Sequence, residues 1–336
     1  MAVKLEDISV VIPVYNGQAT LERCLTSLSD VWAELREVIL VDDGSVDETS
    51  KIAARFAKQY ESRFRLIGLQ SNQGSAVARN LGIQNSTGNV LLFLDADDEI
   101  DGSTLKEAIK DFSEEADFLI CGVWFVHGES GEILRKEVFE QDVTVTHEQA
   151  PLDYLLRTRC FFRVLYRRDF LISQEISFFP KKNEILAPFF NIDDYFFQLE
   201  SILYAKSISA SSVSFYKYYV VPSDRKRYRE QAQFFHLGYK MFLDRFVTRS
   251  MNQIVDKQRI QTVFDYASRQ LVQCIIEVRG FNSIKLSNQL LLLLWKSPLS
   301  FRKKLARYLG AIFSFFRVNV GFRSRVYGLL RKLLPS

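Results

Sequence analysis

The stretch "VLLFLDADDEID", residues 90–101, joins a run of apolar residues to a cluster of acidic ones. Val90–Leu94 is typical of a buried strand in an α/β sheet, because such strands are apolar on both faces and do not alternate. The acidic residues that follow are Asp95, Asp97, Asp98, Glu99 and Asp101. Their mutual repulsion is unfavourable unless a positive group lies among them. The stretch therefore predicts a divalent cation, which prefers carboxylate oxygens, at the end of a core strand.

The residues before this stretch alternate between strand and helix patterns. Strands are expected at 8–14, 38–41, 65–69 and 90–94, and helices at 21–28, 48–60 and 74–85. This order predicts an α/β fold with a mostly parallel sheet and right-handed crossovers. Ligands of such sheets bind at the carboxyl ends of the strands. Polar turns follow three of these ends, namely "VYNG" at 14–17, "DDGS" at 42–45 and "DADD" at 95–98.

Asp95 and Asp97 are the first candidate metal ligands, since they flank a single small residue, Ala96. In extended backbone, residues i and i+2 point to the same side, so both carboxylates are expected to face one site. The alternative is an acidic turn before a helix that is capped by Asp101 or Ser103. The apolar strand in front and the two partner turns favour the metal.

The other two turns and one helix offer candidate nucleotide-binding residues. Asp43 ends the second strand, and its carboxylate suits a base N–H or ribose hydroxyls; an Asx turn with Gly44 is the alternative. Tyr15 leaves the first strand where a planar base can stack on it. Arg79 lies inside the helix expected at 74–85, within reach of a base or phosphate unless it belongs to a solvated face.

The pattern becomes less regular beyond residue 133. The stretch 157–171, "RTRCFFRVLYRRDFL", alternates arginines with aromatic residues, and an amphipathic helix is expected to begin near Asp193 or Asp194. The stretch 212–220, "SVSFYKYYV", predicts a strand rich in tyrosine, and the chain is expected to be helical from Tyr228.

The charge of the chain is distributed unevenly. Twelve of the 44 basic residues and none of the 40 acidic ones lie in 278–336, which leaves 32 basic and 40 acidic residues before it. A body with a net charge of −8 therefore carries a strongly basic end, rich in leucine and phenylalanine. This pattern predicts an amphipathic helical region on an anionic membrane surface, or one packed on the rest of the protein. Nucleic acid is not expected as a partner, because apolar residues separate the basic ones.

Composition is globular, with 336 residues, 47% hydrophobic and 25% charged. The four cysteines are far apart and the three histidines are scattered, so neither a disulfide framework nor a zinc signature is expected. No apolar run approaches the ~18 residues of a membrane-spanning helix, and the first residues do not form a signal peptide pattern. These features predict a cytoplasmic protein that lies at the inner face of the membrane.

The order of "VIPVYNG", "VDDGS-DE", "GSAVARNLGI" and "STGNVLLFLDADD" closely resembles the family 2 glycosyltransferases, which have the GT-A fold. The resemblance is dense over about 8–100 and continues more thinly to about 225. It implies a GT-A catalytic domain at 1–225, with a nucleotide-binding half at about 1–125 and an acceptor half at 126–225. The helical basic region is then 226–336.

The resemblance also implies roles for the residues of the donor site. Tyr15 would stack on the uracil of a UDP-sugar, and Asp43 and Arg79 would contact the base. Asp95 would hold the ribose or help to hold the metal. Asp97 would bind Mn²⁺ or Mg²⁺ that bridges the diphosphate.

Two further residues receive roles from the resemblance. Asp98 is an alternative metal ligand, because alignment with the family can shift by one residue there. Asp194 would be the general base that takes the proton of the acceptor hydroxyl. The pair Asp193–Asp194 resembles the family's "ED" element, with aspartate in place of the glutamate.

Together these features predict a metal-dependent, inverting glycosyltransferase that moves a hexosyl or N-acetylhexosaminyl group from a UDP-sugar to a glycan or lipid-linked glycan. The resemblance alone implies the setting, which is the assembly of bacterial surface polysaccharide. The Gln-x-x-Arg-Trp element of processive family members is missing, so one sugar is expected per encounter. A metal-dependent nucleotidyltransferase and a non-catalytic sugar-nucleotide-binding module with a partner-binding tail are the alternatives. The oligomeric state is left open.

Overall fold

The computed structural model describes most of the first 220 residues and short helical pieces beyond them. The described residues are 2–60, 62–139, 143–146, 161–178, 192–220, 239, 241–246, 260 and 262–268, with backbone alone at 143–146 and 192–193. Contacts divide the chain into two units, the first made of 1–151, 159–187 and 193–222 and the second of 152–158, 188–192 and 223–336. The predicted division into 1–225 and 226–336 stays a proposal.

The elements alternate along the first unit as the sequence predicts. The strands are β1 (Ile8–Val14), β2 (Glu37–Asp42), β3 (Phe64–Gly68), β4 (Val90–Phe93), β5 (Glu99–Ile100), β6 (Phe118–His127), β7 (Ile133–Glu137), β8 (Val143–Thr146), β9 (Val164–Arg167) and β10 (Ser207–Val220). The helices are α1 (Leu21–Thr26), α2 (Thr49–Gln59), α3 (Ser75–Asn85), α4 (Gly102–Ala108), α6 (Arg168–Ser173) and α7 (Ile192–Tyr204), with 3₁₀ turns η1 (Leu5–Asp7) and η2 (Ile109–Asp111).

The described strands form one sheet in the order β3-β2-β1-β4-β9-β6-β10-β5, with β7 on β6 and β8 on β10. The strands β3, β2, β1 and β4 are all parallel, as predicted. The other half is mixed: β9 runs antiparallel to both β4 and β6, whereas β10 is parallel to β6. The α/β class is confirmed. The strands β1, β2, β3, β4, β6 and β10 run in one direction, and β5, β7, β8 and β9 run opposite to them. Connections to the later strands carry no local pattern that would set strand direction.

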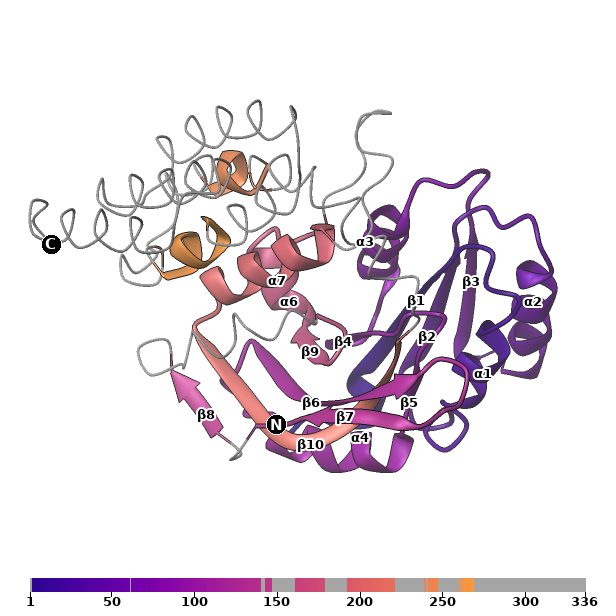
Figure 1. The fold of residues 1–336 in the computed structure, drawn as a ribbon, viewed down its shortest axis with the longest axis horizontal. Helices are drawn as coiled ribbons and strands as arrows, with labels where there is room; N and C mark the ends of the chain where they lie inside the picture. The colour runs from indigo at the N-terminus through magenta and orange to yellow at the C-terminus, as the bar shows by residue number, and fades with distance from the viewer. Residues whose placement is uncertain are drawn as a thin grey trace, which may run out of the picture. The chain divides into compact units, whose positions relative to one another are not determined.

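Helices cover both faces of the parallel half of the sheet. Figure 1 shows α3 on one side of β1, β2 and β3, and α1 and α2 on the other. Right-handed crossovers require this arrangement, because the chain moves outward from β1 to β3 and then returns past β1 to reach β4. The strand order therefore brings the carboxyl ends of β2, β1 and β4 side by side.

The apolar run that opened the sequence analysis is buried as predicted, with every residue from Val90 to Leu94 at 0% exposure. Phe93 lies in an aromatic cluster built by segments far apart in the sequence. Its ring makes edge contacts with Tyr166, Phe178 and Phe197, with centroids 5.2–6.0 Å apart. The rings of Phe178 and Phe197 stack at 3.9 Å. These contacts fix the start of α7 against β4 and β9.

The second unit is described at a few helical residues. The ring of Phe264 packs against Tyr239, Phe242 and Phe246 with centroids 4.8–6.4 Å apart. The basic region at 278–336 lies outside the described residues. Over the part of the chain that is described, no helix has the length and apolar character needed to cross a bilayer.

Candidate active site

The polar turns after β1, β2 and β4 meet at one edge of the sheet, which confirms the predicted convergence. Hydrogen bonds join the first two turns directly. The backbone N–H of Asn16 donates to Oγ of Ser45 at 2.9 Å, and that of Val46 donates to Oδ1 of Asn16 at 3.0 Å. The N–H of Gly17 donates to Oγ1 of Thr49 at 2.8 Å. The two turns therefore form one rigid rim beside the end of β4.

Tyr15 and Asp43 lie on this rim in different environments. The ring of Tyr15 is 45% exposed, although it follows a fully buried strand. Asp43 is buried, and its two carboxylate oxygens accept the backbone N–H groups of Gln73 and Gly74, each at 2.7 Å. Gly74 has φ of +97° and precedes α3, so the carboxylate anchors the loop that opens this helix. The rim therefore carries one exposed aromatic ring and one buried carboxylate that is fixed by the loop before α3.

The residues after β4 form a turn rather than the extended segment that the i, i+2 argument assumed. The N–H of Asp98 donates to the carbonyl of Asp95 at 3.0 Å and closes the turn. Asp95 is half-buried, Asp97 is exposed and Asp98 is only 1% exposed. The expectation of an extended backbone was wrong, because the chain must reverse here to enter β5. The three carboxylates therefore differ in their access to solvent.

Asp98 is held from the far side by β10. Its Oδ2 accepts a hydrogen bond from the hydroxyl of Tyr216, and its Oδ1 accepts one from the N–H of Tyr219, both at 2.8 Å. Burial raises the pKa of the Asp98 carboxyl well above its ordinary value, and the charges of Asp97 and Asp95 raise it further. Asp98 is thus turned into the protein, away from the exposed carboxylate of Asp97.

Arg79 joins the end of β4 to α7. Its Nη2 donates to Oδ1 of Asp95 at 2.7 Å, and its Nη1 donates to Oδ1 of Asp194 at 2.8 Å. The guanidinium lies over the rings of Phe161 and Phe178, with Cζ 4.6 and 5.2 Å from their centroids. At 4% exposure, Arg79 does not belong to a solvated helix face, the alternative that the sequence left open.

Asp194 lies in the first turn of α7 and is 8% exposed. The helix is placed by Phe197, which lies one turn further along and packs into the aromatic cluster around Phe93. Asp194 is 115 residues from Arg79 in the sequence, yet the structure brings the two side chains into direct contact. The side chain of Asp193 lies outside the described residues. The structure therefore brings Asp194 to the end of β4 through Arg79, and the predicted role of Asp194 as the general base stays a prediction.

The carboxylates at this edge suit a divalent ion that is completed by a phosphate ligand. In the regions with described side chains, no group of three or more His, Cys, Asp or Glu residues forms a metal cage. Asp97 is exposed, and Asp95 lies two residues before it. The hydrogen bond from Arg79 to Asp95 is to Oδ1 of that carboxylate. Mg²⁺ and similar ions are commonly held by one or two carboxylates plus substrate phosphates. The donor set fits that arrangement.

Several residues at the site were missed by the reasoning from sequence. Phe161 and Phe178 pack against Arg79, and Tyr216, Tyr219 and Arg23 surround the turn after β4. The tyrosine-rich strand and the alternating arginine–aromatic stretch were visible as patterns. Neither pattern says which residues face the acidic turn, because that depends on strand register and on helix packing.

Comparison with known proteins identifies the family. Residues 9–173 match the family described as Glycosyl transferase family 2. The chain belongs to this family. The putative glycosyltransferase EpsH of Bacillus subtilis is 28% identical over 243 residues, 70% of this chain and 67% of EpsH. The poly(ribitol-phosphate) beta-N-acetylglucosaminyltransferase TarS of Staphylococcus aureus is 28% identical over 218 residues, which are 62% of this chain and 35% of TarS.

Solved structures show the same fold. Residues 1–349 of TarS in complex with UDP-GlcNAc align with a TM-score of 0.67 and 20% identity, over 97% of this chain and 92% of that one. The mannosyltransferase PcManGT of Pyrobaculum calidifontis, in complex with GDP-Man and Mn²⁺, aligns with a TM-score of 0.52 and 15% identity, over 93% of this chain and 88% of that one. The family 2 chain therefore has the GT-A fold that the sequence motifs implied, and its family membership supports glycosyltransferase activity.

Proposed function

We propose that this chain transfers a sugar from a UDP-sugar to a hydroxyl of a glycan or lipid-linked glycan, with Mn²⁺ or Mg²⁺ and with inversion at the anomeric carbon. The observation that carries the proposal is the contact of Arg79 with both Asp95 and Asp194. It supports a catalytic base next to a donor-site carboxylate. One such base suffices for a single displacement, in which the acceptor oxygen attacks as the UDP departs.

The donor end of the site is assigned to the rim and the helix behind it. The exposed ring of Tyr15 stacks on the uracil. Asp43 is assigned to the base, and its hydrogen bonds to the N–H groups of Gln73 and Gly74 fix the position of its carboxylate on the rim. Arg79 keeps its assignment to the nucleotide and gains a second role, which is to orient Asp95 and Asp194.

The metal-binding role is assigned to Asp97 and Asp95, which would hold the ion together with the diphosphate. When bound, such an ion supplies positive charge that stabilises the departing UDP. The Mn²⁺ in the PcManGT complex supports this assignment by analogy of fold. The half-buried Asp95 also offers an acceptor to a ribose hydroxyl.

Asp194 is assigned as the general base. Because Arg79 holds one of its oxygens, the carboxylate has a defined orientation before the acceptor arrives. The acceptor hydroxyl loses its proton to this carboxylate while its oxygen attacks the anomeric carbon. The burial of Asp194 limits competition from water, so hydrolysis of the donor is slower than transfer.

Two experiments separate this proposal from its alternatives. A panel of UDP-sugars with Mn²⁺, beginning with UDP-GlcNAc because TarS binds it, should show one donor that raises the thermal midpoint and releases UDP in the presence of acceptor. Release of pyrophosphate from a nucleoside triphosphate would instead indicate a nucleotidyltransferase. Binding of the donor with no turnover on any glycan or lipid-linked acceptor would indicate a non-catalytic module.

The acceptor setting and location follow from the relatives and from the basic region. The name of TarS supports a bacterial surface polymer and an N-acetylhexosaminyl or other hexosyl donor. We assign 278–336 to an anionic membrane surface at the inner face of the cytoplasmic membrane, where basic residues each contribute about 1 kcal/mol of attraction.

Lys303→Glu with Lys304→Glu should reduce flotation of the full chain with phosphatidylglycerol vesicles at low salt. Unchanged flotation would favour a region packed on the protein.

A further inference from the structure

The turn that carries Asp95 and Asp97 is held by two groups of β10 that lie behind it. The buried hydroxyl of Tyr216 donates to Asp98 at 2.8 Å and accepts the backbone N–H of Asp95 at 3.1 Å. One hydroxyl thus connects the first and the last residue of the turn. The N–H of Tyr219 donates to the other oxygen of Asp98 at 2.8 Å. Asp98 and Tyr216 therefore form a hydrogen-bonded brace inside the protein.

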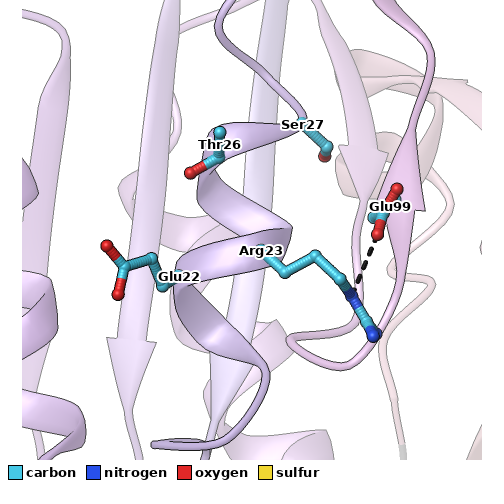
Figure 2. Close-up of a pocket in the computed structure, with 5 residues that line it drawn as sticks. All are labelled: Glu22, Arg23, Thr26, Ser27 and Glu99. Atoms are coloured by element: carbon cyan, nitrogen blue, oxygen red, sulfur yellow. Dashed lines mark ion pairs between the residues drawn. The ribbon is translucent and has the colours of Figure 1, made fainter. Parts of the chain in front are cut away.

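A second contact holds the middle of the same turn. Arg23 of α1 donates from Nη2 to the carbonyl oxygen of Asp97 at 2.5 Å. Its Nε lies 2.9 Å from Oε1 of Glu99, and these two side chains line an open pocket beside α1 (Figure 2). The guanidinium also lies 3.8 Å from the centroid of the Tyr219 ring. Arg23 thus binds the backbone of Asp97 and leaves its carboxylate on the exposed side.

These contacts divide the carboxylates of the turn into two kinds. The carboxylate of Asp97 is exposed, whereas that of Asp98 accepts hydrogen bonds on both oxygens from β10. An ion that took Asp98 as a ligand would have to reach a carboxylate that is 1% exposed, or displace the hydroxyl of Tyr216, which is itself 0% exposed and whose ring stacks on Phe162 at 4.7 Å. Replacing it would also release the N–H of Asp95 from its only acceptor in this brace.

We propose that Asp98 and Tyr216 are positioning residues, which hold the Asp95–Asp98 turn in the shape that binds the metal–diphosphate group, and that Asp98 is not a metal ligand. The proposal rests on the metal-dependent donor site assigned above. Because the Tyr216–Asp98 hydrogen bond joins the two side chains, a substitution of either residue breaks this same bond. Their effects on donor binding are therefore coupled rather than independent.

The test is a double-mutant cycle with Tyr216→Phe and Asp98→Asn in the full chain. The readout is the Kd of UDP in the presence of Mn²⁺, measured by calorimetry, with Mn²⁺ binding followed by electron paramagnetic resonance. Each single variant is expected to raise this Kd by about fivefold to tenfold, and the double variant by about the same factor. At saturating donor and Mn²⁺, kcat should stay within about twofold of the parent, since the turn still adopts its shape when filled.

A matched control is Tyr218→Phe, which removes a hydroxyl from the same strand while its ring stays against Phe162 and Phe125. It should leave the Kd of UDP unchanged. If Asp98→Asn abolishes Mn²⁺ binding while Tyr216→Phe has little effect, Asp98 is a ligand and the inference is overturned. If the two factors multiply, the residues act independently and the inference is overturned as well. If Tyr216→Phe lowers only the melting temperature, its role is merely structural and the inference is again overturned. Failure of the parent protein to bind UDP with Mn²⁺ would overturn the proposed function itself.

Discussion

The parallel strands have buried carboxylates at both ends of the sheet, and the hydrogen-bond partners of these carboxylates differ between the two ends. At the amino ends, Oε1 of Glu37 accepts hydrogen bonds from Oγ of Ser9 and from N and Oγ1 of Thr87 at 2.6–2.8 Å, and Oε2 lies 3.3 Å from Arg65. At the carboxyl ends, Asp95, Asp97, Asp98 and Asp194 lie on two elements that the single guanidinium of Arg79 joins. Among the described residues, one end therefore has a carboxylate matched by donors, and the other has more acidic groups than basic ones.

This difference indicates that the carboxylate at the amino ends serves stability, whereas the carboxylates at the carboxyl ends serve ligand binding. Three neutral donors and one cation satisfy the carboxylate of Glu37 without any ligand. Glu37 therefore has a structural role at the amino ends of the strands, where the N–H of Gly88 also donates to Ser9. A cluster with more acids than cations is unfavourable in the empty protein and becomes favourable when a cation binds. Substitutions at the carboxyl ends should therefore change ligand binding and turnover, and those at the amino ends should change stability.

Removal of the metal should give the largest effect. EDTA should abolish transfer, and Mn²⁺ or Mg²⁺ should restore it, because the excess acids at the carboxyl ends require a cation. Asp97→Ala should lose the metal-dependent part of UDP affinity, as measured by calorimetry with and without Mn²⁺. Glu37→Gln, at the opposite end of the same sheet, is the control and should keep the full metal response. Undiminished transfer in EDTA would contradict the metal assignment.

Asp194→Asn should give the next largest effect. The amide keeps the shape of the side chain but accepts no proton, so kcat should fall by about 10²-fold or more, with the Kd of UDP nearly unchanged. Steady-state rates and calorimetry on the same preparation measure both quantities. Asp193→Asn is the matched control. An inactive Asp193→Asn beside an active Asp194→Asn would mean that the neighbours have exchanged roles.

Arg79→Lys should give an intermediate effect. A lysine keeps the charge but has no planar fork, so it cannot bind Asp95 and Asp194 in the same way while it packs against the rings of Phe161 and Phe178. We expect kcat/KM to fall roughly tenfold or more. Arg65→Lys makes the same change at the amino ends and should leave kcat/KM as it was. Equal losses in both variants would remove the functional contrast between the two ends.

Glu37→Gln should have no effect on turnover and a measurable effect on stability. Burial acts to raise the pKa of Glu37, but hydrogen bonds from Thr87, Ser9 and Arg65 outweigh it, and the pKa lies below its ordinary value of 4.5. The charged form therefore stabilises the fold above pH 4.5, and this contribution is lost as pH falls through the lower folded pKa. Glutamine should lower the free energy of unfolding by about 1–3 kcal/mol at neutral pH, where the side chain leaves one donor unmatched.

Urea unfolding at neutral pH and at several values below pH 4.5 checks this sign. The gap between the parent protein and Glu37→Gln should narrow as the solution becomes more acidic. A gap that widens on acidification would mean that the pKa of Glu37 is raised instead. A loss of turnover in folded Glu37→Gln would show that the amino ends also serve function.

The local elements of the donor half were predictable because their signals are local. The apolar run at 90–94 and the turn residues after it suffice to mark a buried strand that ends in acidic groups. Asp101 as the cap of α4 was also one of the predicted choices, and its Oδ1 accepts the N–H of Thr104 at 3.0 Å. The convergence of the three turns followed from strand order, since parallel strands that alternate with helices place their carboxyl ends together.

Long-range contacts were beyond what these signals carry. The sequence marked Arg79, Asp95 and Asp194 as separate candidates, and only the folded chain brings Arg79 into contact with Asp194, 115 positions further along, as well as with Asp95. The same holds for Asp98. In the sequence it is one of several neighbouring acidic residues, and nothing there indicates that Tyr216 and Tyr219, 118 and 121 positions later, bind its carboxylate. Periodicity and turn chemistry describe a few neighbouring residues. Which carboxylate faces the solvent depends on the register of β10 and the packing of α7, and those are set by contacts between distant segments.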